Sequence, residues 1–151
     1  MEEPPIIPSG ALNERRSNEV VAGGRAFFSE REWVPFPFQL EAWKWCSGGG
    51  DGLVNAPTGS GKTYSVMVPA VLGGGNPGGL RVLWITPIRA LAKEIHGSAG
   101  KLLAFAGQGW QCGIRTGDTP ASEKQRQDRR LPEVLVTTPE SLHVLLAKRD
   151  M

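Results

Sequence analysis

The stretch Ala-Pro-Thr-Gly-Ser-Gly-Lys-Thr, residues 56–63, is the feature that most restricts how this chain can fold. A short apolar run, Gly52 to Asn55, precedes it, and a longer apolar run, Tyr64 to Leu72, follows it. This pattern predicts a strand over 52–55, a glycine-rich turn, and a helix that begins at Lys62. Glycines let the backbone curl so that amide N–H groups and a helix N-terminus point at one place, which is how proteins hold a polyphosphate.

The residues that follow the glycines suit a nucleotide site. Lys62 would bring a mobile positive charge to the β- and γ-phosphates, and the Thr63 hydroxyl would ligate magnesium. A glycine turn that merely ends a strand is the alternative, but it does not account for lysine and threonine at this spacing. We therefore predict a nucleotide with Mg²⁺, Lys62 and Thr63 as catalytic residues, and Thr63 as the metal ligand. The residues predicted to bind the phosphates are Thr58, Gly59, Ser60, Gly61, Lys62 and Thr63.

A glutamine upstream of the turn indicates which base the site takes. Gln39 lies in the segment Pro-Phe-Pro-Phe-Gln-Leu, residues 35–40. A glutamine amide can donate to and accept from the edges of adenine, so Gln39 is predicted to select ATP. Phe36 or Trp33 could stack on the base, and either could instead fill space beside the preceding helix. Of the two, Phe36 is predicted to contact the nucleotide.

The size and composition allow one globular domain and favour no particular partner. A chain of 151 residues can bury roughly two-thirds of its unfolded surface in one core. Hydrophobic residues make up 40% of the chain and charged residues 21%, which is typical of a soluble protein. The net charge of +2 neither supports nor excludes nucleic acid as a partner.

The cysteines and the apolar runs bear on where the protein works. Cys46 and Cys112 are far apart and have no neighbouring cysteine or histidine at metal-binding spacing, which argues against a zinc site or a disulfide framework. No apolar run approaches the ~18 residues that a membrane helix needs, and the N-terminus lacks the positive start of a secretory signal. We expect a protein of the reducing cytoplasm.

Apolar periodicity divides the chain into a tail followed by helices and strands. Residues 1–18 are predicted to be a flexible tail, and residues 19–151 to belong to one domain. Helices are predicted over Glu19–Trp33, Phe38–Cys46, Lys62–Leu72, Arg89–Phe105, Ala121–Arg130 and Glu140–Lys148, and strands over Gly52–Asn55, Arg81–Ile85, Gln111–Arg115 and Val134–Thr137. The continuously apolar strand over 81–85 is predicted to be buried on both faces. This alternation predicts a doubly wound, mostly parallel α/β sheet with ligands at the carboxyl ends of its strands.

Three polar segments fall where predicted strands end. They are Thr86–Ala92, Thr116–Pro120 and Thr137–Leu142, and each supplies small hydroxyls and the amides of a helix start. Taken singly, each could be a helix cap or a turn. Together along one sheet edge, they would contact a nucleic-acid backbone without reading its sequence.

In this order, the glutamine segment, the glycine turn and the three polar segments resemble one family. Ala-x-Thr-Gly-x-Gly-Lys-Thr is similar to the P-loop of superfamily 2 helicases. The whole set resembles the first motor domain of Lhr-type helicases, and most of all the bacterial ligase-associated DEXH-box DNA helicases. The resemblance extends from about Phe27 to Lys148, and it rests on residues 35–40, 56–63, 83–92, 115–120 and 136–142. It implies a RecA-like P-loop NTPase domain.

The resemblance also implies a function. It points to a motor that hydrolyses ATP with Mg²⁺ and moves 3′ to 5′ along single-stranded DNA, in DNA repair beside partners such as a DNA ligase and a nuclease. RNA is not excluded, because backbone contacts are common to both nucleic acids. The residues that it assigns to the nucleic acid are Thr86, Pro87, Arg89, Thr116, Asp118, Thr137, Thr138 and Glu140. Amides and hydroxyls are expected to matter more there than the two carboxylates, which phosphate repels. The basic helix with Lys124, Arg126, Arg129 and Arg130 would add nonspecific attraction for a nucleic acid, but a solvated helix face is the favoured interpretation.

The chain departs from the family pattern near its end. The Asp-Glu-x-His motif, which holds magnesium and orients the attacking water, has no counterpart up to Met151, and a second motor domain with its arginine finger is missing. An arginine finger alone contributes ~10³ to 10⁵ in rate, so we expect residues 1–151 to hydrolyse ATP poorly. We also expect a fold that is incomplete at its C-terminal end, marginally stable and prone to aggregation.

Two other functions remain open on the sequence alone. A non-catalytic helicase remnant would keep the nucleotide and nucleic-acid contacts without motor activity. A P-loop kinase would explain Lys62 and Thr63, but it would explain neither Gln39 nor the three polar segments, and no arginine-rich lid is evident.

Overall fold

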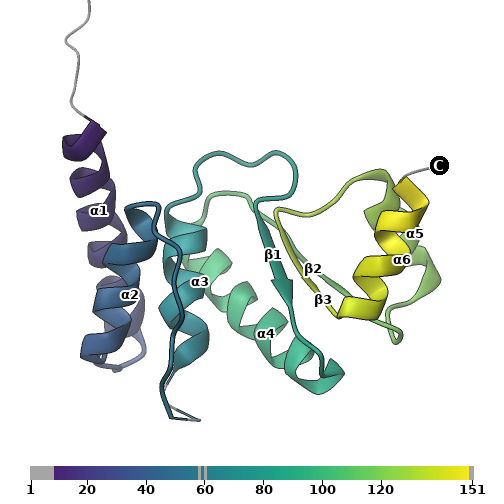
Figure 1. Ribbon diagram of the computed structural model, residues 1–151, viewed down its shortest axis with the longest axis horizontal. Helices are drawn as coiled ribbons and strands as arrows, with labels where there is room; N and C mark the ends of the chain where they lie inside the picture. The colour runs from purple at the N-terminus through teal and green to yellow at the C-terminus, as the bar shows by residue number, and fades with distance from the viewer. Residues whose placement is uncertain (1–8, 58, 60, 150–151) are drawn as a thin grey trace, which may run out of the picture. The chain divides into compact units, whose positions relative to one another are not determined.

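The computed structural model describes residues 9–57, 59 and 61–149, in two units that divide between Gly73 and Gly74. The N-terminal unit contains α1 (Ser9–Glu30), α2 (Pro37–Ser47) and α3 (Lys62–Leu72). The C-terminal unit contains β1 (Val82–Ile85), α4 (Arg89–Ala106), β2 (Cys112–Arg115), α5 (Ala121–Arg129), β3 (Val134–Thr137) and α6 (Pro139–Arg149) (Figure 1). Apart from α1, every predicted helix and the last three predicted strands agree with these bounds to within one residue. Within the described ranges, no helix is long and apolar enough to cross a membrane.

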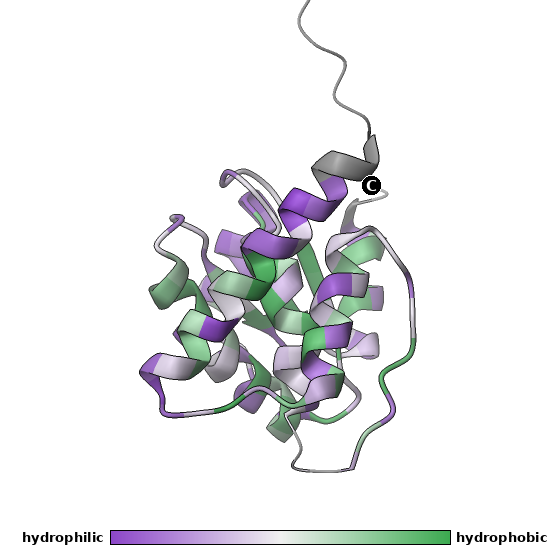
Figure 2. Ribbon diagram, turned by 90° about the vertical axis from the view of Figure 1, so that its left-hand side faces the viewer, coloured by the Kyte–Doolittle hydropathy of each residue, from purple (hydrophilic) through white to green (hydrophobic). Residues whose placement is uncertain are grey.

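Helix α1 begins inside the stretch that was predicted to be a flexible tail. That prediction is wrong for residues 9–18, which are helical, while residues 1–8 lie outside the described residues. The first coloured turns of α1 are hydrophilic (Figure 2). Arg15 pairs there with Glu19 at 3.1 Å, and Arg16 donates to the Gly73 carbonyl at the end of α3. A helix with mostly polar, exposed side chains carries little apolar periodicity, so its start could not be read from the pattern.

An aromatic cluster joins the three helices of the N-terminal unit. The rings of Phe27 and Phe28 on α1 lie 5.3 and 6.0 Å from the ring of Tyr64 on α3, and Phe28 lies 5.3 Å from Trp43 on α2. Trp43 is completely buried, and its indole N–H donates to the Tyr64 carbonyl at 2.9 Å. A Cβ at Gly24 would lie 2.6 Å from the Trp43 ring, so α1 can approach α2 only through a glycine there. These contacts hold the first turn of α3 in place.

The segment before the glycine turn differs from its prediction. In the described structure residues 52–55 form no strand, and Leu53 is 92% exposed. The run holds only two apolar side chains, and a strand needs a paired neighbour for its backbone groups. Trp45 lies against the start of the segment and donates its indole N–H to the Asp51 carbonyl at 2.7 Å.

Three parallel strands form the sheet of the C-terminal unit, in the order β1-β3-β2. Their last paired row holds Ile85, Thr137 and Arg115, so the three strands finish level with one another. The connection through α4 steps across β3 to reach β2, and the connection through α5 steps back. Right-handed connections in opposite directions place α4 on one face of the sheet and α5 on the other, as Figure 1 shows. Helices on both faces agree with the predicted doubly wound arrangement.

Strand order decides which strands are buried. The central residues Val134–Val136 of β3 are completely buried. On the edge strand β1, Leu83 and Ile85 remain 42% and 49% exposed, so the prediction that residues 81–85 are buried on both faces is wrong. A continuous apolar run cannot by itself distinguish a central strand from an edge strand, because strand order is set by tertiary pairing.

A buried carboxylate holds the amino ends of the strands together. Glu133, which directly precedes β3, is only 4% exposed. Its Oε1 accepts the Gly78 N–H at 3.1 Å, before β1, and its Oε2 accepts the Gln111 N–H at 2.8 Å, before β2. Burial opposes the charge on Glu133, but the amide donors and the nearby positive charge of Arg130 lower its pKa below the ordinary value overall.

We expect Glu133→Gln to destabilise the C-terminal unit by about 1–3 kcal/mol near neutral pH, because an amide offers one acceptor oxygen to two N–H donors. The pKa of Glu133 is lower in the folded chain than in the unfolded chain. Its stabilisation is therefore present above the unfolded pKa and is lost as the pH falls through the folded pKa. Urea unfolding at several pH values tests this, with Glu94→Gln on the exposed side of α4 as control. If the difference in the free energy of unfolding between wild type and Glu133→Gln does not shrink in acid, the prediction is contradicted.

Candidate functional site

The glycine turn has the backbone geometry that its sequence predicts. Gly59 and Gly61 have φ angles of 80° and 83°, in the left-handed region that favours glycine. Gly61 is the N-cap of α3, so the helix begins at Lys62. The amides of the first helical turn have no partners within the helix, and the positive end of the helix dipole lies at the turn. Thr58 and Ser60, two predicted phosphate contacts, lie outside the described residues.

The two described glycines of the turn have different surroundings. A Cβ at Gly61 would lie 2.5 Å from Nε2 of Gln39, so a side chain there is excluded by space as well as by φ. No described neighbouring atom lies within 4 Å of a Cβ built at Gly59, so the space beside Gly59 is open. Open space next to helix amides and the base of Lys62 fits the phosphates of a nucleotide.

Lys62 and Thr63 occupy the first two positions of α3 and are partly exposed. The described residues include no group of three or more His, Cys, Asp or Glu side chains that could hold a metal ion. Thr63 would ligate a magnesium ion together with nucleotide phosphates and water, which is a coordination that Mg²⁺ commonly adopts.

Gln39 is buried, and both ends of its amide have partners. Its Oε1 accepts the Phe36 N–H at 2.8 Å, and its Nε2 donates to the Gly61 carbonyl at 3.0 Å. The first bond caps the start of α2, and the second joins α2 to the glycine turn. With only 2% of its surface exposed, Gln39 supports the turn directly. Its contact with adenine stays a prediction.

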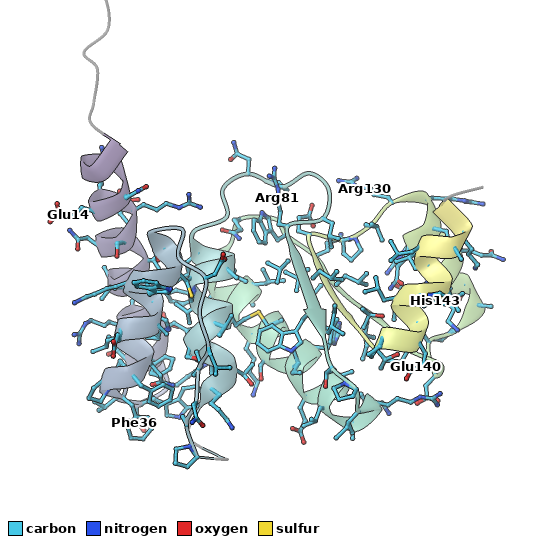
Figure 3. The ribbon with its side chains drawn as sticks, in the orientation of Figure 1. Glu14, Phe36, Arg81, Arg130, Glu140 and His143 are labelled. Atoms are coloured by element: carbon cyan, nitrogen blue, oxygen red, sulfur yellow. The ribbon has the colours of Figure 1, made fainter. Side chains whose placement is uncertain are left out.

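The two aromatic residues considered for base stacking have different positions. Trp33 lies 5.6 Å from Phe28 and 5.9 Å from Tyr64 between ring centroids, so it belongs to the aromatic cluster. Phe36, labelled at the start of α2 in Figure 3, is 53% exposed and stacks on Phe38 at 6.0 Å. Phe36 is therefore the better candidate for a base, and Phe38 is a supporting residue that the sequence interpretation missed. The sequence signal for this supporting role was a second phenylalanine, Phe38, two positions after Phe36.

The three polar segments meet at the end of the sheet where the strands finish, as predicted. They follow the carboxyl ends of β1, β2 and β3, which finish level in the pairing. The Thr86 N–H donates to the Thr137 carbonyl at 3.0 Å, and the Thr137 hydroxyl donates to the Arg115 carbonyl at 2.7 Å. The segments are therefore in direct contact with one another.

The threonines of these segments are used for internal structure. Four predicted contact residues are at most 4% exposed: Thr86, Thr116, Thr137 and Thr138. The Thr116 hydroxyl accepts the Asp118 N–H at 3.2 Å, and the Thr138 hydroxyl donates to the Ser141 hydroxyl at 3.1 Å. These hydroxyls hold turns together, and their contact with nucleic acid stays a prediction.

A cavity of about 500 Å³ opens beside the carboxyl ends of the strands. Four of the eight predicted nucleic-acid contacts line it: Pro87, Arg89, Thr138 and Glu140. Arg115, Lys124, Ser141 and Lys148 also line it and are not among the eight predicted contacts, although Ser141 lies within the predicted polar segment Thr137–Leu142. A signal existed for α6, where Ser141, Val144 and Lys148 are spaced to share one helix face.

One carboxylate joins two cations of the cavity wall. Asp128 on α5 pairs with Arg115 at 2.9 Å and with Lys148 at 3.4 Å, and the Arg115 side chain is only 2% exposed. Partial burial opposes the charge on Asp128, but Arg115 and then Lys148 lower its pKa overall. At another wall of the cavity, Arg89 pairs with Asp118 at 3.0 Å, and both of these side chains are more than half exposed.

The basic residues of α5 and its C-cap, Arg130, do not share one face. Lys124 lines the cavity described above, whereas Arg126 and Arg130 line a separate cavity of about 280 Å³ that includes Glu133. In Figure 3, Arg130 lies at the end of the sheet where the strands begin, and Glu140 lies at the end where they finish. The interpretation of these basic residues as one solvated face is therefore wrong for Lys124, which is half-buried.

Residues 36–151 match the family model described as DEAD/DEAH box helicase. The chain belongs to the DEAD/DEAH box helicase family. It is 33% identical over 144 residues to the Lhr helicase/probable uracil glycosylase of Mycolicibacterium smegmatis, which covers 82% of this chain. It is 35% identical over 113 residues to the ATP-dependent RNA helicase DBP3 of Kluyveromyces lactis, which covers 70% of this chain. The chain spans 10% and 21% of the lengths of these two relatives.

A solved structure supports the same assignment. The structure of Mycobacterium smegmatis helicase Lhr bound to ssDNA and AMP-PNP matches 83% of this DEAD/DEAH box helicase chain and 18% of its own chain. The TM-score is 0.75 at 34% sequence identity. The likeness to Lhr-type helicases and the RecA-like α/β fold, both expected from the motifs, are confirmed.

We expect Gln39→Glu to weaken Mg-ATP binding on the order of 10-fold. The carboxylate can still accept from Phe36, but it would meet the Gly61 carbonyl with no proton to donate. Titration with a fluorescent ATP analogue, with ATP and GTP as competitors, tests this against Gln125→Glu on exposed α5. An unchanged preference for ATP over GTP would show that Gln39 acts through Gly61, and a reduced preference would show that it also reads adenine. Equal binding by Gln39→Glu and wild type would contradict both roles.

Proposed function

We propose that this chain supplies the ATP-binding turn and part of the nucleic-acid surface of an ATP-dependent helicase motor. The observation that carries the proposal is the left-handed turn at Gly59 and Gly61 that leads directly into α3 at Lys62. Membership of the DEAD/DEAH box helicase family supports it.

The roles of the residues follow from their positions. The first amides of α3 and the Lys62 ammonium would bind the phosphates, and the Thr63 hydroxyl would ligate Mg²⁺. Gln39 would keep the Gly61 carbonyl turned away from the phosphates, because its Nε2 donates a hydrogen bond to that carbonyl oxygen. Bound ATP would supply the phosphoryl group whose transfer to water drives movement.

We propose single-stranded DNA as the nucleic acid, because the solved Lhr relative is described as bound to ssDNA and AMP-PNP. RNA is the second candidate, because another relative is named an RNA helicase. Movement from 3′ to 5′ and a role in DNA repair, with a ligase and a nuclease as partners, are proposed from the Lhr likeness alone. A place in the bacterial cytoplasm or nucleoid is proposed from that likeness together with the cysteine pattern. A nucleotide- and nucleic-acid-binding module without motor activity is the alternative, and phosphate release stimulated by single-stranded DNA would exclude it.

We expect Lys62→Ala to weaken Mg-ATP binding by on the order of 10- to 100-fold, since charge-assisted hydrogen bonds to phosphate are lost. Isothermal titration of ATP in the presence of Mg²⁺ measures this. Lys44→Ala on the exposed side of α2 is the control, because it removes the same charge from the same unit away from the turn. Equal losses in Lys62→Ala and Lys44→Ala, or no binding by folded wild type, would overturn the nucleotide site.

We expect Glu140→Gln to strengthen the binding of a single-stranded oligonucleotide by a few-fold at low salt. Glu140 lines the cavity at the end of the sheet, and its negative charge repels a phosphate nearby. Fluorescence anisotropy with labelled dT20 measures the change, and Glu94→Gln on exposed α4 controls for net charge. Weaker binding by Glu140→Gln would instead indicate that the carboxylate accepts a hydrogen bond from the nucleic acid.

A further inference from the structure

One face of α2 carries three buried side chains that can form hydrogen bonds. They are Gln39, Trp43 and Ser47, spaced four residues apart, and residues at this spacing share one face of a helix. Gln39 donates to the Gly61 carbonyl at 3.0 Å, and Trp43 donates to the Tyr64 carbonyl at 2.9 Å. This face of α2 therefore supplies two N–H donors to two carbonyls at the start of α3.

The two bonds enclose the residues that the proposed function assigns to the nucleotide. Gly61 is the N-cap of α3 and Tyr64 is its third residue, so Lys62 and Thr63 lie between the two bonded carbonyls. Ser65, which is completely buried, donates its hydroxyl to the Lys62 carbonyl in the same turn. The C=O and N–H of one peptide unit lie in one plane, so a bond that fixes a carbonyl also fixes the direction of the neighbouring amide.

The backbone of α3 does not hold this first turn by its own hydrogen bonds alone. Pro69 lies buried inside α3, four residues after Ser65. Proline has no N–H to donate to the carbonyl four residues earlier, and its ring crowds that carbonyl. The helical hydrogen-bond ladder is therefore interrupted directly behind the first turn, which leaves a larger share of its orientation to the side chains of α2.

The indole of Trp43 is itself held in place by α1. The ring of Phe28 lies 5.3 Å from the Trp43 ring, and a Cβ at Gly24 would lie 2.6 Å from it. The Trp43 side chain is completely buried, so its ring has no open space into which it could turn. Its N–H is therefore a donor at a fixed position, to which the Tyr64 carbonyl must fit.

We propose that Trp43 is a positioning residue for the phosphate site. Through the Tyr64 carbonyl, its indole N–H orients the first turn of α3 so that the amides of this turn and the Lys62 ammonium face the nucleotide. The proposal rests on the proposed function and deepens it, because it assigns part of the phosphate affinity to a residue that does not touch the nucleotide. Gln39 fixes the near end of the turn and Trp43 the far end, from one face of one helix.

The test measures Mg-ATP binding by the full 151-residue chain with isothermal titration, well below the melting midpoint of every variant. We expect Trp43→Phe to weaken binding roughly 3- to 10-fold, because the ring packing is largely kept while the donor that orients the turn is lost. The affinity for AMP, measured by competition against a fluorescent ATP analogue, should fall less, because AMP lacks the β- and γ-phosphates. A purely structural role would not change the ratio of the two affinities.

The matched control is Ser47→Ala, on the same face of α2. The Ser47 hydroxyl donates to the Trp43 carbonyl, so this variant also loses a buried hydrogen bond of α2, but none to α3. Circular dichroism melts should show a loss of stability in both variants, whereas Ser47→Ala should bind Mg-ATP as wild type does.

A second variant separates the N–H from the shape of the side chain. Trp43→β-(3-benzothienyl)alanine keeps the two fused rings and replaces the N–H by sulfur, so it decides the question if Trp43→Phe does not fold. Wild-type affinity in this folded variant, an equal loss of affinity in Ser47→Ala, or equal losses for ATP and AMP would overturn the role of Trp43. The proposed function would then stand as long as Lys62→Ala weakens Mg-ATP binding by wild type. Failure of folded wild type to bind Mg-ATP would overturn both.

Discussion

The parallel pairing of β3 with both of its neighbours determines where chemistry can occur in the C-terminal unit. Because β1, β3 and β2 finish level, the three polar segments leave the sheet at the same end and contact one another. A register slip of one residue would turn the side chains of β3 to the opposite face. The buried Glu133 carboxylate bonds the amino ends of the same strands, so the position of the cavity depends on hydrogen bonds at the far end of the sheet.

In both units, polar side chains that look like ligand contacts in the sequence are first of all structural. Gln39 bonds the start of α2 to the glycine turn, Thr137 bonds the end of β3 to the end of β2, and Thr138 bonds to Ser141 in the first turn of α6. A buried polar atom costs free energy unless it is hydrogen-bonded, so residues at such tight junctions are satisfied within the protein. In the proposed function, contact with the nucleotide therefore falls to backbone amides and to the longer side chain of Lys62.

The sequence predicts the elements of this chain better than their surroundings. The turn at Gly61 and the strand ends follow from local patterns, since glycine spacing and apolar runs report directly on backbone conformation. The exposure of Leu83 does not follow, because it depends on which strand takes the edge. The sequence does not distinguish Lys124 from Arg126 on the same helix. Only the packing of α5 places Lys124 and Arg126 in the walls of different cavities.

The aromatic cluster of the N-terminal unit bears on where this module can be cut. The helicase family match begins at residue 36, between α1 and α2. A chain shortened to that point would keep the glycine turn, but it would strip Phe27 and Phe28 from Tyr64 and Trp43 and expose their rings to water. The smallest fragment that preserves the surroundings of α3 therefore begins upstream of residue 36 and includes α1. Helix α1 is needed even though it contributes no residue to the glycine turn.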